Sequence, residues 1–131
     1  MNNLPKFVNC PVELSLTLIS GKWKPVLLAH LKQGPLRYGE LRRLVPRLSE
    51  KMLTQRLAEL RALGFIARSS ERGTYRLTKK GETLRPVLQS LYDWGELQAH
   101  ELGISIVDGF GDINSGKAAV SDSSPRAPSI P

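Results

Sequence analysis

The chain has 131 residues, of which 40% are hydrophobic, and it carries a formal net charge of +7. This length predicts one domain with a modest core, and no apolar run approaches the roughly 20 residues that a membrane-spanning helix needs. The positive charge favours polyanionic partners through Coulomb attraction and counterion release. Twelve Lys and Arg residues against four Asp and Glu lie between Arg37 and Lys80, so we expect the polyanion-facing surface there.

Cysteine content and the N-terminal composition bear on the cellular compartment of the protein. Cys10 is the single cysteine, which excludes a disulfide within one chain. Residues 1–9 hold no apolar signal-peptide region, and this predicts a cytoplasmic protein with no membrane partner. His30, His100, one thiol and scattered carboxylates are too few convergent groups for a catalytic or metal site. We therefore expect neither enzyme activity nor a cofactor.

Helical spacing of apolar residues, interrupted by Gly and Pro, predicts four helices in the first part of the chain. They span residues 11–19, 22–32, 37–44 and 50–63. Gly34-Pro35 ends the second helix, after which Leu36 is a short connector or a single bridge residue. Pro46 ends the third helix, because the residue before a proline disfavours helical geometry. Ser49 is a good N-cap for the fourth, and Gly64 suits its C-terminal end.

The second part of the chain predicts a β-hairpin and a last helix. Two short strands, 65–69 and 74–78, flank a polar turn. Thr78 can cap a long helix that runs to about His100. Pro86 lies inside this helix and predicts either a kink or a helix that restarts there.

Three regions are expected along the chain. They are an irregular lead over 1–9, a folded domain over 10–102, and a Gly-, Ser- and Pro-rich disordered tail over 103–131. Within the domain, four helices, a hairpin and a final helix follow the order of a winged helix-turn-helix. This is a mainly α fold with a small β-hairpin wing, in which two helices joined by a tight turn and a basic hairpin form a DNA-reading unit.

The fourth helix divides into an apolar face and a polar face. With Leu53, Leu57 and Leu60 turned inward, a step of 100° per residue places Lys51 and Gln55 roughly opposite. Amide, ammonium and hydroxyl groups at the start of such a helix can reach base edges in the major groove. The predicted base-reading residues are Ser49, Lys51, Thr54 and Gln55. The alternative is an ordinary solvent-exposed helix.

Arginines around this helix are predicted to contact the DNA backbone, which positions a protein without specifying a sequence. Four precede the helix and three lie in the hairpin: Arg37, Arg42, Arg43, Arg47, Arg68, Arg72 and Arg76. Arg43 has the alternative of an ion pair with Glu40, three residues earlier on the same helix. A hairpin tip that carries Arg72 would lie along a minor groove or the backbone.

Six short blocks occur in collinear order over residues 10–99. They read CPVE at 10–13, LISGKW at 18–23, GPLRYGELRR at 34–43, SEKMLTQRL at 49–57, YRLTKKG at 75–81 and LRPVL at 84–88. Together they resemble the HxlR-type winged helix-turn-helix regulators, which are related to the MarR group. The hairpin is shorter than is usual in that family, and Tyr38 stands where Phe is usual.

The resemblance implies a homodimeric bacterial or archaeal transcription regulator, with residues 49–63 as the recognition helix. The first and last helices form the dimer interface in the family. This implies interface roles for the following residues: Leu14, Leu18, Leu91, Tyr92 and Trp94. A twofold dimer binds a pseudo-palindromic operator in double-stranded DNA, with half-sites about one helical turn apart.

The resemblance also implies an effector, because the family tends to sense small molecules, electrophiles or oxidants. Several members use a thiol at the position of Cys10, which makes this residue the candidate redox sensor. The positive end of a helix favours a thiolate and so makes it reactive. The alternative is a small buried residue, which is common for a free cysteine. With no second cysteine, a sensor would form a disulfide between subunits or with a low-molecular-weight thiol.

Two other classes of function stay open. A winged helix can serve as a protein–protein interaction module without DNA binding, although such modules usually lose the basic face. A ligand-binding regulator without thiol chemistry is the second, with Trp23, Tyr92 and Trp94 around a pocket between the dimerisation helices. Large aromatic side chains are more often core or interface anchors. Salt-dependent binding to duplex DNA would separate a DNA-binding protein from a protein-binding module.

Overall fold

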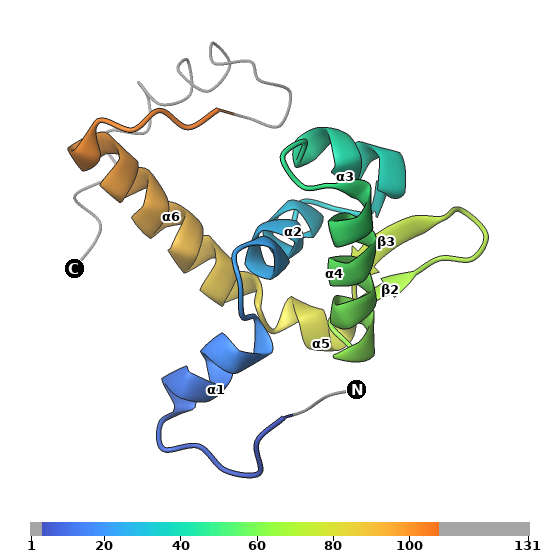
Figure 1. Ribbon diagram of the computed structural model, residues 1–131, viewed down its shortest axis with the longest axis horizontal. Helices are drawn as coiled ribbons and strands as arrows, with labels where there is room; N and C mark the ends of the chain where they lie inside the picture. The colour runs from blue at the N-terminus through green and yellow to red at the C-terminus, as the bar shows by residue number, and fades with distance from the viewer. Residues whose placement is uncertain (1–3, 108–131) are drawn as a thin grey trace.

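The computed structural model describes residues 4–107 and shows six helices and three strands in this range (Figure 1). The helices are α1 (Pro11–Leu18), α2 (Trp23–Leu31), α3 (Tyr38–Leu44), α4 (Glu50–Ala62), α5 (Lys79–Glu82) and α6 (Arg85–Leu102). The strands are β1 (Leu36–Arg37), β2 (Ile66–Arg68) and β3 (Thr74–Leu77). A mainly helical winged helix-turn-helix fold is therefore confirmed. Residues 4–9 hold no helix or strand, and the predicted tail beyond residue 107 lies outside the described residues.

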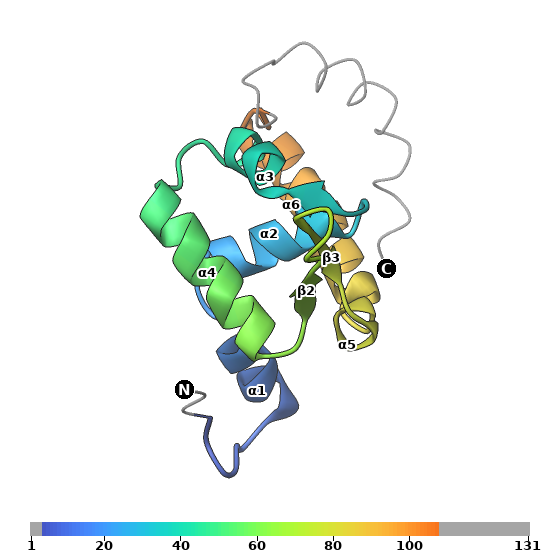
Figure 2. The same ribbon diagram turned by 90° about the vertical axis from the view of Figure 1, so that its right-hand side faces the viewer.

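The core lies where α2, α4 and the sheet pack together (Figure 2). The apolar stripe of α4 is buried as the sequence predicts, since Leu53, Leu57 and Leu60 are each at most 2% exposed. Leu27 and Leu28 of α2 are completely buried. Burying a leucine side chain stabilises a fold by about 1.5–3 kcal/mol, so these contacts fix α4 on the body of the domain.

The sheet is larger than a hairpin. Its strand order is β1-β3-β2 and both pairings are antiparallel, with Leu36 opposite Tyr75 and Ile66 opposite Leu77. The segment expected as a connector or a single bridge is thus a two-residue strand. Side chains alternate between the two faces of a strand, so Tyr75 and Leu77 point into the core while Arg76 between them is exposed.

The expected long last helix is divided in two, as a restart near Pro86 would require. The Thr78 hydroxyl oxygen accepts a hydrogen bond from the Gly81 N–H at 3.0 Å and caps the short α5. Pro86 then lies in the first turn of α6, where a proline ring clashes with no preceding helical carbonyl.

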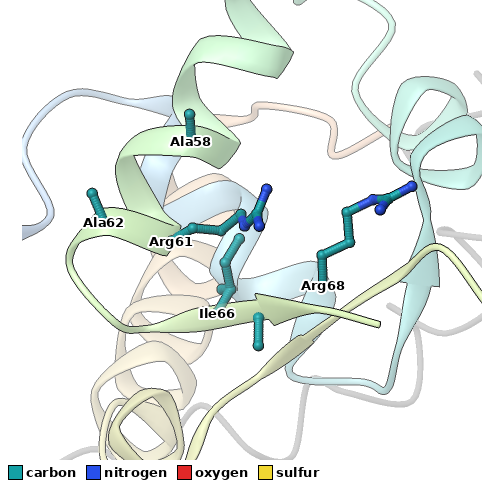
Figure 3. A pocket seen from close by; sticks show the side chains of 6 residues that line it. Ala58, Arg61, Ala62, Ile66 and Arg68 are labelled. Atoms are coloured by element: carbon teal, nitrogen blue, oxygen red, sulfur yellow. The ribbon is translucent and has the colours of Figure 1, made fainter. Parts of the chain in front are cut away.

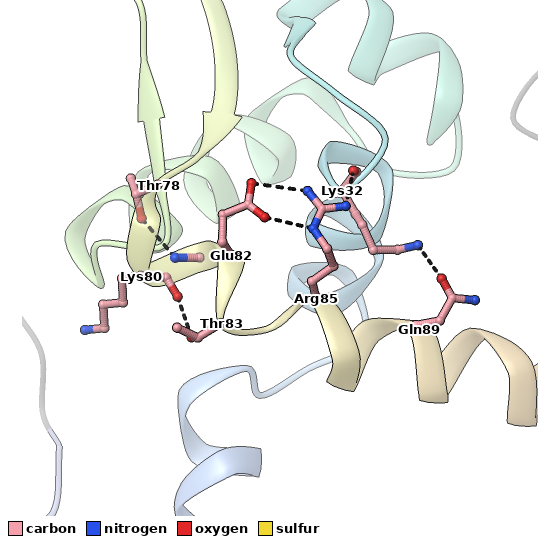
Figure 4. Close-up of polar contacts among 8 residues, drawn as sticks. Lys32, Thr78, Lys80, Glu82, Thr83, Arg85 and Gln89 are labelled. Atoms are coloured by element: carbon pink, nitrogen blue, oxygen red, sulfur yellow. Dashed lines mark hydrogen bonds and ion pairs between the residues drawn. The ribbon is translucent and has the colours of Figure 1, made fainter.

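Polar contacts join the start of α6 to the end of α2 (Figure 4). Arg85 Nη1 donates to the Lys32 carbonyl at 2.9 Å, and Arg85 Nε lies 2.8 Å from Glu82 Oε1. The hydrogen bond from Arg85 lowers the pKa of Glu82. Lys32 Nζ in turn donates to Gln89 Oε1 at 2.9 Å. These contacts attach the first turn of α6 to the end of α2 and to α5.

The first and last long helices leave apolar side chains exposed. α1 buries none of its residues and α6 buries only Leu88, and Figure 1 shows α6 extending away from the body formed by α2 and α4. The exposed apolar residues of the two helices are Val12, Leu14, Leu16, Val87, Leu91, Tyr92, Trp94 and Leu102. None of the helices described over residues 4–107 is both long enough and apolar enough to cross a membrane.

Candidate nucleic-acid interface

The N-terminal half of α4 presents two polar side chains that make no polar contact with the described part of the domain. Lys51 and Gln55 are exposed, and within the described residues 4–107 neither makes a hydrogen bond or an ion pair. They lie four residues apart and so point from the same face of the helix. An ammonium and an amide group on one exposed face can reach acceptors and donors on base edges.

The hydroxyl groups of the other two predicted base-reading residues are engaged inside the domain. Ser49 Oγ accepts from the Met52 N–H at 3.1 Å and caps α4. Tyr38 Oη lies 3.2 Å from the Glu50 carbonyl and 3.2 Å from Thr54 Oγ1. A phenol has one proton, so when Tyr38 donates to the carbonyl, Thr54 donates to Tyr38. Both residues thus help to form α4 and attach it to α3.

A charged cluster connects the inner side of α4 with α2. Glu59 Oε1 lies 3.5 Å from Lys24 Nζ on α2 and 3.4 Å from Arg56 Nη1 on α4. The Lys24 side chain is only 13% exposed, so solvent screens this pair less than a surface ion pair. The cluster adds to the leucine contacts that set the position of the polar face.

The arginines that precede α4 separate into two kinds. Arg42 Nη1 donates to the Leu48 carbonyl at 2.5 Å, and Arg42 Nε lies 4.0 Å from Glu50, so this side chain braces the turn between α3 and α4. Arg43 and Arg47 are exposed. Arg43 makes no ion pair with Glu40, and Glu40 Oε1 accepts instead from the Arg37 backbone N–H at 2.8 Å.

The other arginines that are predicted to contact the DNA backbone lie on different faces of the sheet or in its turn. Arg68 is opposite Tyr75 in the β2–β3 ladder and shares the face that points toward the core. Arg76 is opposite Ala67 on the outer face, and the pairing of Arg37 with Thr74 puts Arg37 on that outer face too. Arg72 lies in the exposed β2–β3 turn. The fold therefore separates Arg68 from Arg76, although the sequence places both in one basic hairpin.

A hollow of about 550 Å³ opens between the C-terminal half of α4 and β2. Figure 3 shows Arg61 reaching from α4 across Ile66, with Arg68 rising from the strand beside it. Ala58 and Ala62 line the helix side. Sequence reasoning did not single out Arg61. A sequence signal for this hollow is that Lys51, Gln55, Ala58 and Ala62 share one helix face. The two alanines have small side chains, so the surface next to Arg61 is low there.

Cys10 is exposed and lies at the N-cap of α1, which contradicts the alternative of a small buried residue. Its backbone is extended, with φ −148° and ψ 137°, and its carbonyl accepts from the Glu13 N–H at 2.9 Å. The Glu13 carboxylate accepts from the Asn9 N–H at 3.1 Å in the same turn. The thiol is thus accessible at the start of α1.

The remaining titratable residues provide no other chemical centre in the described part of the chain. Burial lowers the pKa of His30 on α2, as expected for an imidazole inside a helical body. Over residues 4–107, no three His, Cys, Asp or Glu side chains come together in a group that could hold a metal ion.

The arrangement of these elements defines the class of the protein. α3 and α4 are joined by a tight turn, α4 presents a polar face, and the β2–β3 hairpin stands beside it, which together make a winged helix-turn-helix protein. Residues 18–102 match the family model described as HxlR-like helix-turn-helix. The chain belongs to the HxlR-like helix-turn-helix family.

Proteins similar to this chain are transcriptional regulators. The HTH-type transcriptional regulator YdeP of Bacillus subtilis is 44% identical over 95 residues, which cover 69% of this chain and 74% of YdeP. The redox regulator HypR in its oxidized form is 40% identical, with a TM-score of 0.63 over 66% of this chain and 95% of HypR. Quinone-bound YodB from B. subtilis is 32% identical, with a TM-score of 0.59 over 67% of this chain and 99% of YodB. The chain is thus a transcriptional regulator of the helix-turn-helix type.

Proposed function

We propose that this chain binds a pseudo-palindromic operator in duplex DNA as a homodimer, with α4 in the major groove. The exposed pair Lys51 and Gln55 carries this proposal. Their functional groups are unused within the described residues, while the leucines on the opposite face of α4 are buried. Gln pairs with adenine through two hydrogen bonds, and Lys reaches the acceptors of guanine. Arg43, Arg47 and Arg72 add positive charge beside this face for phosphate contacts.

Replacing Gln55 with alanine should weaken binding to the operator by about 5- to 150-fold, which corresponds to about 1–3 kcal/mol for a good base contact. The operator is first selected with the wild-type protein from a pool of random-sequence duplexes. Fluorescence anisotropy then compares that operator with a scrambled duplex. Only binding to the operator should decrease, because the lost contact reads a base.

Gln33→Ala is the matched control, since it removes the same exposed amide group from the turn after α2. It should bind both duplexes as the wild type does. If Gln55→Ala keeps the full preference for the operator, the base-reading face is placed wrongly. If the wild type shows no salt-dependent binding to any duplex, the protein–protein interaction module is the better account.

The exposed apolar faces of α1 and α6 support the homodimer. An 18-residue helix that buries a single leucine gains little from packing within its own domain. Val87, Leu91 and Trp94 recur at helical spacing and are 45–58% exposed. Exposed apolar stripes of this kind mark protein–protein contacts. The predicted interface residues Leu14, Leu91, Tyr92 and Trp94 are all exposed, and Leu18 is half-buried.

Cys10 is the proposed sensor of oxidants or electrophiles. Its exposure and its place at the start of α1 support this role, and α1 belongs to the proposed dimer interface. The similar protein HypR is a redox regulator, and the similar structure of YodB is a quinone-bound form. Oxidation of two Cys10 thiols by diamide would form one disulfide between subunits and reduce the diamide by two electrons. The helices that hold the dimer together would then change their separation.

Diamide or a quinone should change the affinity of the wild-type protein for its operator, and Cys10→Ser should abolish that response while keeping the affinity of the untreated protein. Anisotropy titrations measure the affinity. Mass spectrometry under non-reducing conditions identifies the product, either a dimer of twice the mass or an adduct on one thiol. A response of equal size in Cys10→Ser would exclude this cysteine as the sensor.

A further inference from the structure

We propose that Arg61 and Arg68 bind one DNA backbone phosphate between them, in the hollow between α4 and β2. This inference rests on the proposed DNA binding and deepens it. It adds Arg61 to the DNA-binding interface and has both arginines bind the same phosphate.

The shape of the hollow suits a nucleic-acid strand. Its volume is about 550 Å³, and its lining residues are Ala58, Arg61, Ala62, Ile66, Ala67 and Arg68. Ala58 and Ala62 keep the helix side of the hollow low, so a sugar–phosphate chain can approach the protein backbone. The two guanidinium groups come from different elements, the last turn of α4 and the end of β2, and both rise at the edge of the same space (Figure 3).

The charge of the hollow is not compensated by the domain itself. Within the described residues, neither Arg61 nor Arg68 lies within 4.0 Å of a carboxylate oxygen. Guanidinium groups bind phosphate through short, charge-assisted hydrogen bonds, and two of them can share one phosphate.

Arg68 is already held in position for such a contact. Its Cζ lies 5.9 Å from the centre of the Tyr75 ring, which is 9% exposed. Its Nη2 lies 3.5 Å from where a Cβ of Gly73 would be, so the guanidinium rests close to the turn of the hairpin. Less side-chain entropy is lost on binding when the donor is held in advance.

The hollow lies on the same side of α4 as the base-reading pair. Lys51, Gln55, Ala58 and Ala62 follow one another at steps of four, three and four residues, which is one face of a helix. When the first half of this face lies in the major groove, one DNA strand runs over the second half, between α4 and the β2–β3 hairpin. Arg61 and Arg68 would hold that strand.

Salt-dependent binding of Arg61→Ala, Arg68→Ala and the double variant tests the proposal. The probe is a fluorescein-labelled random-sequence duplex about three helical turns long, titrated over a series of KCl concentrations. Each single variant should lose about 5- to 10-fold in affinity. The double variant should lose little more than either single variant, because both arginines hold the same phosphate. Its plot of log K against log[KCl] should flatten by about 0.9 for each subunit.

Lys79→Ala is the control, since it removes one positive charge from the exposed start of α5, directly after the hairpin. Its loss should be clearly smaller than that of Arg68→Ala, and thermal unfolding should show that all variants stay folded. Wild-type affinity in Arg61→Ala would overturn the inference and leave the proposed function intact. Fully additive losses would also overturn it, by assigning the arginines to separate phosphates. A wild-type protein that fails to bind the duplex would instead overturn the proposed function.

Discussion

Replacing Gly81 with alanine should lower the free energy of unfolding by about 3 kcal/mol, the upper range for a side chain forced into a packed site. Gly81 is buried in α5, and a Cβ there would overlap the Phe65 carbonyl oxygen and lie 3.1 Å from the carbonyl carbon. These are backbone atoms, and the same carbonyl accepts from the Thr78 N–H at 3.0 Å. The overlap can be relieved only by moving α5 away from the base of the hairpin. Urea unfolding followed by circular dichroism measures the loss.

Gly39→Ala provides the control for this experiment. Gly39 lies in α3, and a Cβ at this position would meet no atom within 4 Å. Because alanine has a higher helix propensity than glycine, we expect Gly39→Ala to be as stable as the wild type or up to about 1 kcal/mol more stable. A Gly81→Ala protein with wild-type stability would show that α5 is not packed against Phe65 in solution.

Replacing Leu91 with glutamate should convert the protein to a monomer and reduce its affinity for the operator by about 10²- to 10⁴-fold. Leu91 is 48% exposed on α6, so the domain itself does not need this side chain. In the proposed dimer, a carboxylate there would be taken out of water without a partner. The loss in DNA affinity follows because two linked half-site contacts become two separate binding events. Analytical ultracentrifugation measures the mass, and anisotropy measures the affinity.

The control is His100→Glu, which adds the same negative charge to the opposite face of α6 near its C-terminal end. It should remain a dimer with an affinity close to that of the wild type. Both variants should keep the helical signal of the wild type in circular dichroism. A Leu91→Glu protein that sediments as a dimer would exclude this face of α6 from the interface.

Local sequence signals predict most of the fold. The N-cap at Ser49, the glycine at position 64 and the leucine spacing between them place α4 within one residue of its observed end. What the sequence leaves open depends on tertiary contacts. Leu36 forms a strand only because Tyr75 lies opposite it, and the choice between a kink and a restart at Pro86 depends on how Arg85 joins α2 and α5.

The candidate site is predicted less completely than the fold. Residue type identifies Lys51 and Gln55 as polar groups on an exposed face. The N-cap signal predicts that Ser49 bonds the first turn of α4 at Met52, but residue type does not show that Thr54 is engaged with Tyr38. The division of Arg68 and Arg76 between two faces of the sheet follows from strand alternation once the register is known. The hollow beside Arg61 needs the helix and the strand to be brought together, which no local pattern reports.

Because Arg85 attaches α6 to the domain at its first turn, a change of tilt at this turn displaces the far end of the helix. Eighteen residues at 1.5 Å per residue make it about 27 Å long, so a tilt of about 5° at its first turn carries the far end through about 2 Å. That shift is comparable to the difference between a made and a broken hydrogen bond at a base edge. Small chemical events near the pivot would therefore be amplified into a change in the distance between two recognition helices.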